Sequence, residues 1–137
     1  MLIEQGDDKY FVKLLDFGLA KNQSLTRLTE TGEVLGTISY LPPEQISQRI
    51  FNQKSDVYSL GVIFYELITL EKPFLGEQPI DIIKQILEKD PLEPLVLRAE
   101  ISSELNTLIN SMLAKNPEKR PSSLELHDLI FQLTSHP

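Results

Sequence analysis

The 137-residue sequence contains no cysteine, which excludes disulfide bonds and metal sites built on thiolate ligands. It has two histidines, His127 and His136, and their place near the C-terminus does not indicate a metal site. Basic residues are also scarce, with 13 Lys and Arg against 20 Asp and Glu, a net charge of −7. Because nucleic acid binding depends largely on neutralising phosphates, we expect no nucleic acid partner.

Long hydrophobic runs are absent as well. No segment approaches the ~20 apolar residues that a membrane span needs. The N-terminus turns acidic after Met1, Leu2 and Ile3, so the sequence does not predict a signal peptide. We therefore expect a cytoplasmic chain with no membrane span. Its 41% hydrophobic and 24% charged residues fit one globular domain or a piece of one.

The N-terminal third contains one strand pattern and one long loop. Residues 9–15 alternate and then become apolar, which predicts a short strand after a turn at residues 6–8. Residues 19–41 are rich in Thr, Ser, Gly and Glu without a sustained period. A loop of this length inside a compact domain is usually functional.

The remainder is predicted to be helical. Pro42-Pro43-Glu44 should open a short helix, and Ser55 or Asp56 should cap a longer one. Residues 57–70 are apolar almost all the way round, which indicates a buried helix ended by Lys72-Pro73.

Three amphipathic helices should follow. The first, near 79–89, has an apolar face formed by Ile80, Ile83, Ile86 and Leu87. The second, near 102–114, matches the helical template at Leu105, Leu108, Ile109, Met112 and Leu113. The third begins with the capping box Ser122-x-x-Glu125 and has the stripe Leu126, Leu129, Ile130 and Leu133. We interpret these stripes as core, and the Pro-rich stretches at 91–94 and 116–117 as connectors.

Several short motifs occur in a fixed order. They are Asp16-Phe17-Gly18, Gly36-Thr37-Ile38-Ser39-Tyr40, Pro42-Pro43-Glu44, Asp56-Val57-Tyr58-Ser59-Leu60-Gly61 and Arg120. Each is weak alone, but together they resemble the C-terminal lobe of eukaryotic-type protein kinases over residues 10–133. The sequences of residues 40–45 and 55–61 are most similar to those of the bacterial branch of Ser/Thr kinases. An unrelated helical protein with chance motifs is the rival interpretation.

The resemblance implies a mainly α fold, with a short N-terminal β-hairpin followed by about five helices. Residues 1–137 would form a partial kinase domain, with an activation segment at 16–44 and a helical subdomain at 45–135. ATP and Mg²⁺ would be the cofactors of the complete kinase, and a protein bearing Ser or Thr its substrate.

The resemblance also assigns roles to the N-terminal motif and the loop. Asp16 would bind magnesium through a hard carboxylate oxygen, with Phe17 and Gly18 shaping the turn that carries it. The alternative for this tripeptide is a plain β-turn. Thr29 and Thr31 match paired threonines that are autophosphorylated in bacterial kinases, and the alternative there is a solvated loop.

Further roles fall on the helical part. Thr37 would help shape the substrate site, and its presence argues for Ser/Thr rather than Tyr specificity. Glu44 and Arg120 would form a structural ion pair; the alternative is two unrelated surface charges. Asp56 would support the catalytic loop by accepting backbone N–H groups, serve as a simple N-cap, or do both.

Much of a kinase is missing from this sequence. It has no Gly-rich phosphate loop, no β3 lysine, no helix-C glutamate, and no His-Arg-Asp motif with its downstream Asn. We expect that the chain alone lacks catalysis and binds no ATP or Mg²⁺ tightly. The leading hypothesis is part of a protein serine/threonine kinase. The alternatives are a non-catalytic interaction module and half of a split kinase that pairs with its own missing N-terminal half.

Overall fold

The computed structural model describes residues 2–6, 9–13 and 37–135, and side-chain burial for 37–135. The chain divides into two compact units, residues 1–30 and residues 31–137, which we describe separately. In the first unit, β1 (Leu2–Gly6) pairs antiparallel with β2 (Lys9–Lys13), with Leu2 opposite Lys13 and Gly6 opposite Lys9. The expected hairpin is therefore present. Residues 7–8 of its turn and residues 14–15 lie outside the described part.

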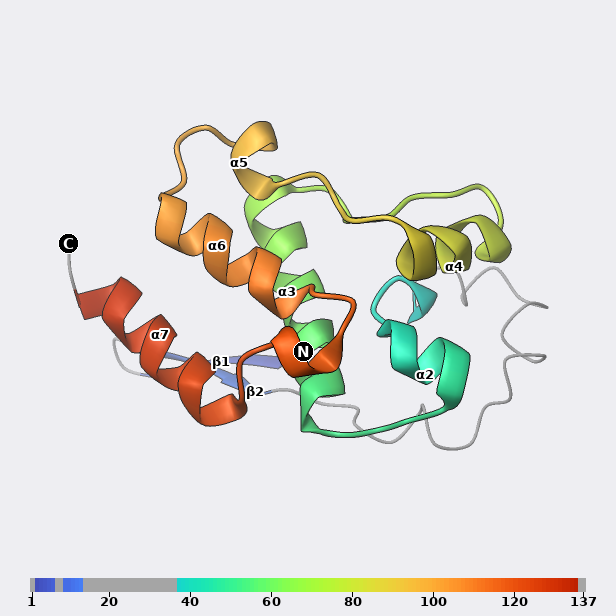
Figure 1. Ribbon diagram of the computed structural model, residues 1–137. Coiled ribbons are helices and arrows are strands. Elements are labelled where there is room, and N and C mark those ends of the chain that lie inside the picture. Colours follow the sequence, from blue (N-terminus) through green and yellow to red (C-terminus); the bar gives the residue numbers. More distant parts are fainter. Residues whose placement is uncertain (1, 7–8, 14–36, 136–137) are drawn as a thin grey trace. The chain divides into compact units, whose positions relative to one another are not determined.

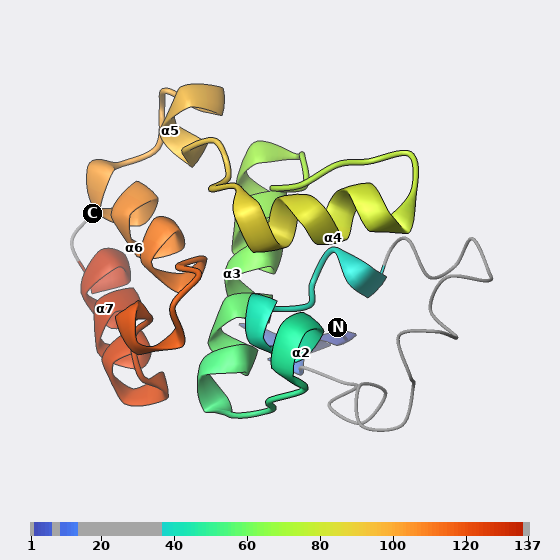
Figure 2. The ribbon, with the colours of Figure 1, turned by 45° about the vertical axis from the view of Figure 1, so that its right-hand side comes forward.

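The second unit is helical (Figure 1). Along the chain its elements are α2 (Pro43–Gln48), α3 (Gln53–Thr69), α4 (Pro79–Glu88), α5 (Pro94–Leu97), α6 (Ser103–Met112), the 3₁₀ helix η2 (Pro117–Lys119) and α7 (Ser123–Ser135). Helix α3 is central and contacts α5, α6, η2 and α7, while α2 contacts α4 (Figure 2). None of the helices described here combines the length and the apolar character that a bilayer crossing requires.

Helix α3 begins earlier than the sequence pattern predicts. Asn52, not Ser55 or Asp56, is its N-cap, because the Asn52 side chain accepts a hydrogen bond from the Ser55 backbone N–H at 3.0 Å. The Ser55 hydroxyl in turn accepts from the Asn52 N–H at 3.4 Å, which completes a capping box. The helix also ends before Lys72-Pro73. Leu70 adopts the left-handed conformation at φ 62° and closes it.

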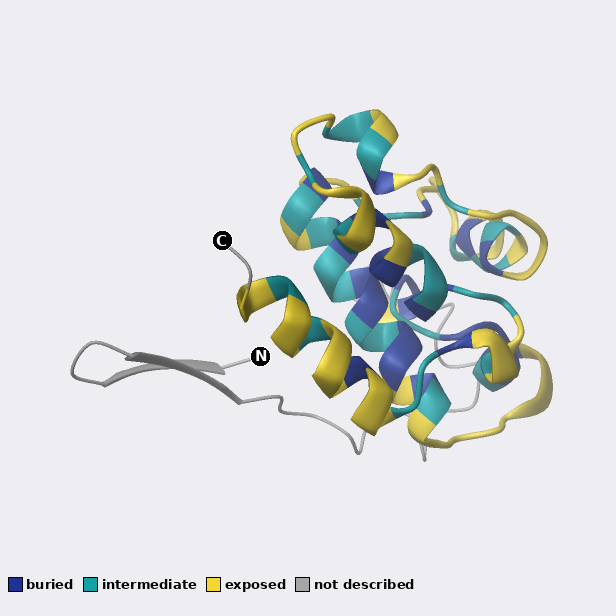
Figure 3. Cartoon of the chain, turned by 60° about the vertical axis from the view of Figure 1, so that its left-hand side comes forward, coloured by how far each residue is buried: buried dark blue, intermediate teal, exposed yellow. Residues whose placement is uncertain are grey.

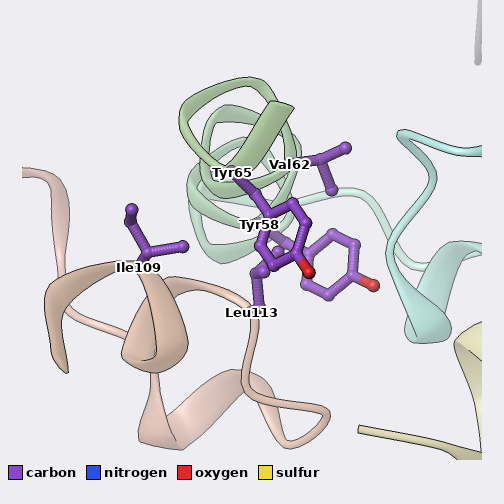
Figure 4. Close-up of a cluster of buried hydrophobic side chains, with 5 residues drawn as sticks. All are labelled: Tyr58, Val62, Tyr65, Ile109 and Leu113. Carbon is purple, nitrogen blue, oxygen red and sulfur yellow. The ribbon is translucent and has the colours of Figure 1, made fainter. Parts of the chain in front are cut away.

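The core lies between α3, α6 and α7. One cluster joins Tyr58, Val62 and Tyr65 of α3 to Ile109 and Leu113 at α6 (Figure 4). A second joins Val57 to Leu108, Met112 and Leu126. Buried residues accordingly run through the middle of the helical unit, with exposed residues on the outer faces (Figure 3).

Gly61 sets the approach of α3 to α6. A Cβ at this position would lie 2.8 Å from the Met112 Cβ, closer than real contacts allow. The absence of a side chain therefore permits this close helix packing.

The enclosure of α3 is less complete than its composition suggests. Leu67 is 59% exposed, and Leu60, Phe64 and Ile68 are only partly buried. Leu60, Phe64 and Ile68 still pack at the edges of the two core clusters, and Leu67 is the apolar side chain of α3 that is exposed.

The predicted inner face of α4 is only partly right: Ile86 is buried and Ile83 half-buried, but Ile80 and Leu87 are exposed. Its buried residues are Ile82 and Ile86, whereas Ile80 is 66% exposed and Leu87 is 40% exposed. With five apolar side chains in this helix, two faces are possible, and the structure buries the one that contains Ile82 and Ile86.

The last helices follow the predicted pattern more closely. Leu108, Ile109, Met112 and Leu113 are buried, and Leu105 packs partly buried beside them. The Ser122–Glu125 capping box is confirmed by reciprocal hydrogen bonds of 2.7 and 3.2 Å. In α7 only Leu126 is fully buried, and Leu129 is 41% exposed. Helix α5 was not predicted; it begins at Pro94, the last residue of the predicted connector 91–94, because proline suits the first turn of a helix.

Candidate functional site

The residues from Thr37 to Glu44 form the part of the candidate site that the structure describes. The segment begins with a tight turn in which the Tyr40 and Leu41 N–H groups donate to the Thr37 and Ile38 carbonyls at 3.2 and 3.0 Å. Ile38 and Ser39 are buried, whereas Thr37 is exposed. The turn thus anchors the segment from within and leaves Thr37 on the surface.

Tyr40 fastens this turn to α3. Its hydroxyl donates a 2.5 Å hydrogen bond to the Glu66 Oε2, and its carbonyl accepts one of 2.8 Å from the Ser59 hydroxyl. Burial and the bond to Glu66 raise the pKa of Tyr40 to about 12. The Lys72 Nζ lies 5.5 Å from the centre of the Tyr40 ring. The Tyr40 side chain is therefore held by Glu66 and Lys72 near the C-terminal end of α3, and its backbone by Ser59 in the middle of that helix.

The segment ends at a buried ion pair. Glu44 is 5% exposed and Arg120 is 2% exposed, and they lie 76 positions apart in sequence. Arg120 Nη1 donates to Glu44 Oε1 at 2.7 Å, and Nη2 donates to Oε2 at 2.9 Å. This is the bidentate geometry in which guanidinium and carboxylate interact most strongly. The structure thus brings together the two residues that the sequence suggested as partners.

Every donor of Arg120 is used. Besides Glu44, its guanidinium donates to the carbonyls of Ala114, Lys54 and Lys115, at 2.8, 2.9 and 3.2 Å. Its guanidinium carbon lies 4.9 Å from the Tyr58 ring centre. A buried arginine with five satisfied N–H groups avoids the desolvation penalty of an unpaired charge.

The Glu44 carboxylate is held from two sides. Its Oε1 also accepts a 2.8 Å hydrogen bond from the Ser55 hydroxyl, which belongs to the α3 capping box. Burial alone would raise the pKa of Glu44. The hydrogen bonds from Arg120, from the backbone and from Ser55 outweigh it and lower the pKa below its ordinary value. Glu44 therefore connects the segment to the start of α3 and to the region before α7.

Asp56 stands one turn into α3 and is exposed. Within residues 37–135 its carboxylate has no hydrogen-bond or ion-pair partner, and partial desolvation by neighbouring groups raises its pKa above the ordinary value. Because Asn52 caps the helix, the role of a simple N-cap is excluded for Asp56. A carboxylate in this position is free to accept N–H groups from another segment.

The remaining predicted site residues, namely Asp16, Phe17, Gly18, Thr29 and Thr31, lie outside the described residues. Within the described part, no group of three or more His, Asp or Glu side chains is placed to hold a metal ion. Sequence reasoning missed the Tyr40–Glu66 bond, although the charged Glu66 in an otherwise apolar stretch of helix was a visible signal.

Comparison with known proteins supplies the context for this geometry. The protein kinase domain model matches residues 1–137. The serine/threonine-protein kinase PknB of Mycolicibacterium smegmatis is 40% identical over 111 residues, covering 80% of this chain and 18% of the relative. The Mycobacterium leprae protein of the same name is 42% identical over 110 residues, with the same shares covered. This chain thus spans under a fifth of the length of these relatives.

A solved structure shows the same fold. The twitchin kinase region from C. elegans superimposes with a TM-score of 0.64 and 22% sequence identity, covering 74% of this chain and 18% of that one. At this identity the likeness concerns the fold alone.

Proposed function

Because this chain belongs to the protein kinase domain family, we propose that it is part of a protein serine/threonine kinase. In the complete enzyme it would contribute to transfer of the ATP γ-phosphate to Ser or Thr hydroxyls of a protein substrate. The two relatives named above are serine/threonine-protein kinases by name, which supports this class of activity. The match covers 18% of the length of those relatives, so the activity is proposed for the complete enzyme and not for these residues alone.

The observation that carries the proposal is the double anchoring of residues 37–44. The Tyr40–Glu66 hydrogen bond holds one end and the buried Glu44–Arg120 pair holds the other. Three residues before Tyr40, Thr37 is exposed at the start of the hydrogen-bonded turn. Positioning a reactive hydroxyl in phosphoryl transfer requires such a fixed surface. We assign Thr37 to the substrate side of the site on this basis.

Asp16, Phe17 and Gly18 are assigned to the metal and nucleotide side. Bound Mg²⁺ neutralises the phosphate oxygens of ATP during transfer, and Asp16 would supply one of its carboxylate ligands. Thr29 and Thr31 are assigned as phosphoacceptors, where a phosphate would add about −1.5 to −2 charge to an already acidic chain.

Asp56 is assigned to support of the catalytic loop. Its exposed carboxylate, which finds no partner within residues 37–135, fits a group that accepts N–H donors from a segment supplied elsewhere. Replacing Asp56 by Asn would remove the charge that strengthens such hydrogen bonds.

A chimera tests the proposal directly. The N-terminal lobe and catalytic loop of the M. smegmatis PknB kinase domain are joined to residues 1–137, and phosphate transfer from radiolabelled ATP to a generic substrate protein is measured. We expect the chimera to transfer phosphate. The Asp16→Ala and Thr37→Ala variants should lose this activity, and the Thr37→Ser variant should retain it. Exposed Thr107, whose hydroxyl donates only to its own helix at the Ser103 carbonyl, provides the matched control Thr107→Ala. A folded chimera without transfer would contradict the proposal.

The alternatives give different results. A split kinase predicts that the same two halves, expressed as separate polypeptides, associate and regain transfer. A non-catalytic interaction module predicts a folded, inactive chimera. For the chain alone, titration with ATP and Mg²⁺ should show no saturable micromolar binding.

A further inference from the structure

A cavity of about 280 Å³ lies at the C-terminal end of α3, between the following loop, α4 and the segment after α4. Tyr65 and Phe74 line it and are almost completely buried, at 2% and 3% exposure. Leu75 and Leu92 line it as well and are 61% and 62% exposed. The cavity therefore combines buried aromatic rings with two exposed leucines.

The walls of this cavity are fixed by interactions within the chain. The Gln85 side-chain amide donates a 2.5 Å hydrogen bond to the Leu75 carbonyl, which ties the loop to α4. The Thr69 hydroxyl accepts from the Glu71 N–H at 3.2 Å and donates to the Tyr65 carbonyl at 2.8 Å. Behind the cavity, the Lys115 Nζ lies 4.2 Å from the Phe74 ring centre. A preorganised cavity of this kind reduces the entropy cost of binding.

Apolar exposure around the cavity continues beyond its lining. Leu70, immediately before the loop, is 74% exposed and has a left-handed backbone. Exposed apolar groups rimmed by polar residues are a mark of protein interaction sites. The volume is smaller than the roughly 300–1,000 Å³ typical of small-molecule and cofactor sites, and it suits one large side chain better.

The surroundings of the cavity are acidic. Between residues 71 and 93 the chain has six acidic residues and three lysines, which gives −3 of the total −7. All six acids are exposed: Glu71, Glu77, Asp81, Glu88, Asp90 and Glu93. Two of the lysines, Lys72 and Lys89, line the cavity together with Glu71 and Asp90, and Lys72 also lies over the Tyr40 ring, so the excess of negative charge comes from the acidic residues outside the lining. This charge favours a basic partner, and it disfavours both a second copy of this acidic chain and an anionic membrane.

We propose that this cavity is a docking site for an extended, basic segment of a partner protein. The segment inserts one aromatic side chain between Leu75 and Leu92, against Tyr65 and Phe74, and places Lys or Arg beside Glu71 and Asp90. Such docking requires neither ATP nor phosphate transfer and is independent of the function proposed above. Because Lys72 both lines the cavity and covers Tyr40, a docked segment would lie next to the residues that follow Thr37.

The test is a binding titration with a defined probe. A fluorescein-labelled peptide, Gly-Arg-Arg-Gly-Phe-Gly-Arg-Arg-Gly, is titrated with the 137-residue chain at low salt and followed by fluorescence anisotropy. We expect saturable binding, about tenfold weaker when the peptide Phe is replaced by Ala. Replacing its arginines by glutamates should abolish binding.

Variants of the chain locate the site. Leu75→Ala and Leu92→Ala alter exposed side chains, so they should leave the fold unchanged and weaken binding several-fold. Val96→Ala, at 70% exposure and outside the cavity, is their matched control. Glu71→Gln with Asp90→Asn should weaken binding and reduce its salt dependence. Glu118→Gln, exposed and remote from the cavity lining, should do neither.

Equal thermal melting curves establish that each variant is folded. The proposal is overturned if the Ala peptide binds as tightly as the Phe peptide, if Leu75→Ala and Leu92→Ala bind normally, or if no saturation is reached at millimolar peptide. Self-association that disappears in Leu75→Ala would likewise overturn it, in favour of a second copy as the occupant.

Discussion

The Tyr40 hydroxyl donates a 2.5 Å hydrogen bond to Glu66 across 26 positions of sequence, whereas the Tyr58 hydroxyl is buried with no partner within the described residues. Removing each hydroxyl by a Tyr→Phe substitution therefore compares a hydrogen-bonded hydroxyl with one that makes no hydrogen bond. Tyr40→Phe deprives Glu66 of its donor and should destabilise the chain by about 1–2 kcal/mol. Tyr58→Phe removes a hydroxyl without a hydrogen bond and should be neutral or stabilising.

Urea denaturation measures both effects, and amide hydrogen exchange shows where they act. In Tyr40→Phe we expect faster exchange of the Tyr40 and Leu41 amides, which close the turn after Thr37. If the two variants lost equal stability, the Tyr40–Glu66 bond would not be what anchors this turn.

The Glu44–Arg120 pair predicts a large loss of stability on removal of either charge. Glu44→Gln leaves a buried guanidinium without its counter-ion and should cost about 3–5 kcal/mol in the free energy of unfolding. Arg120→Lys keeps the charge but cannot reproduce five fixed donors, so a substantial loss remains. Glu118→Gln, on the surface, should change stability by less than about 0.5 kcal/mol.

The same ion pair should also make the stability of the folded chain depend on pH in the acid range. The pKa of Glu44 is lower folded than unfolded, so its stabilisation is complete above the unfolded value and is lost as pH falls through the folded value. In wild type, stability should therefore decline below about pH 4.5 more steeply than in Glu44→Gln. If the free energy of unfolding of wild type and of Glu44→Gln fell equally steeply with decreasing pH, this role of the carboxylate would be ruled out.

Leu70 predicts a gain of stability by a glycine substitution. Its φ of 62° is costly for a residue with a branched side chain, and its side chain is 74% exposed, so little packing is lost on removal. Leu70→Gly should stabilise the chain by about 0.5–1 kcal/mol after the entropy of the more flexible unfolded chain is counted. Leu67→Gly, in the helical part of α3 and similarly exposed, should destabilise it by about 1 kcal/mol.

Thermal and urea denaturation of the two glycine variants provide the measurement. Opposite signs are the expected result. A loss of stability in both would mean that the left-handed backbone at Leu70 carries no strain.

Lys115 predicts an increase of stability at alkaline pH. Burial lowers the pKa of its amine from 10.5 to about 8. The positive charge of Arg120 also lowers the pKa, and the negative charge of Asp90 partly opposes this shift. Between these two pH values the unfolded chain binds the proton and the folded chain does not, so stability rises with pH through this window. Its full contribution is up to about 3 kcal/mol.

The measurement is the free energy of unfolding from pH 7.5 to 9.5. This range stays below about pH 10, where tyrosines of the unfolded chain ionise. The fold raises the pKa of Tyr40, Tyr58 and Tyr65, so ionisation of these tyrosines in the unfolded chain would lower the stability of the folded chain. Lys115→Met retains contact with Phe74 and should flatten the profile. Lys119→Met, at an exposed lysine, should keep the wild-type slope.

Local patterns determined much of the fold in advance. The family and the fold class, a helical lobe after a short hairpin, are confirmed by the family match and by the twitchin kinase likeness. The Ser122–Glu125 capping box was readable because both partners lie within one turn of sequence. The start of α3 was misplaced because Asn52, Ser55 and Asp56 are all good caps, and only the observed hydrogen bonds distinguish them.

Other features required the tertiary structure. Periodicity alone could not decide which stripe of α4 turns inward, since Ile80 and Ile82 are equally apolar. The pairing of Glu44 with Arg120 spans 76 positions and has no local signal, so the sequence suggested it only through resemblance. The cavity beside Phe74 depends on how the loop before α4 folds back, which composition does not encode.

The network around Arg120 has a consequence for how this helical unit comes apart. One guanidinium joins the end of residues 37–44, the first turn of α3 and the stretch after α6. None of these three regions can fray without breaking bonds of the other two. We therefore expect them to melt in a single cooperative step rather than one after another.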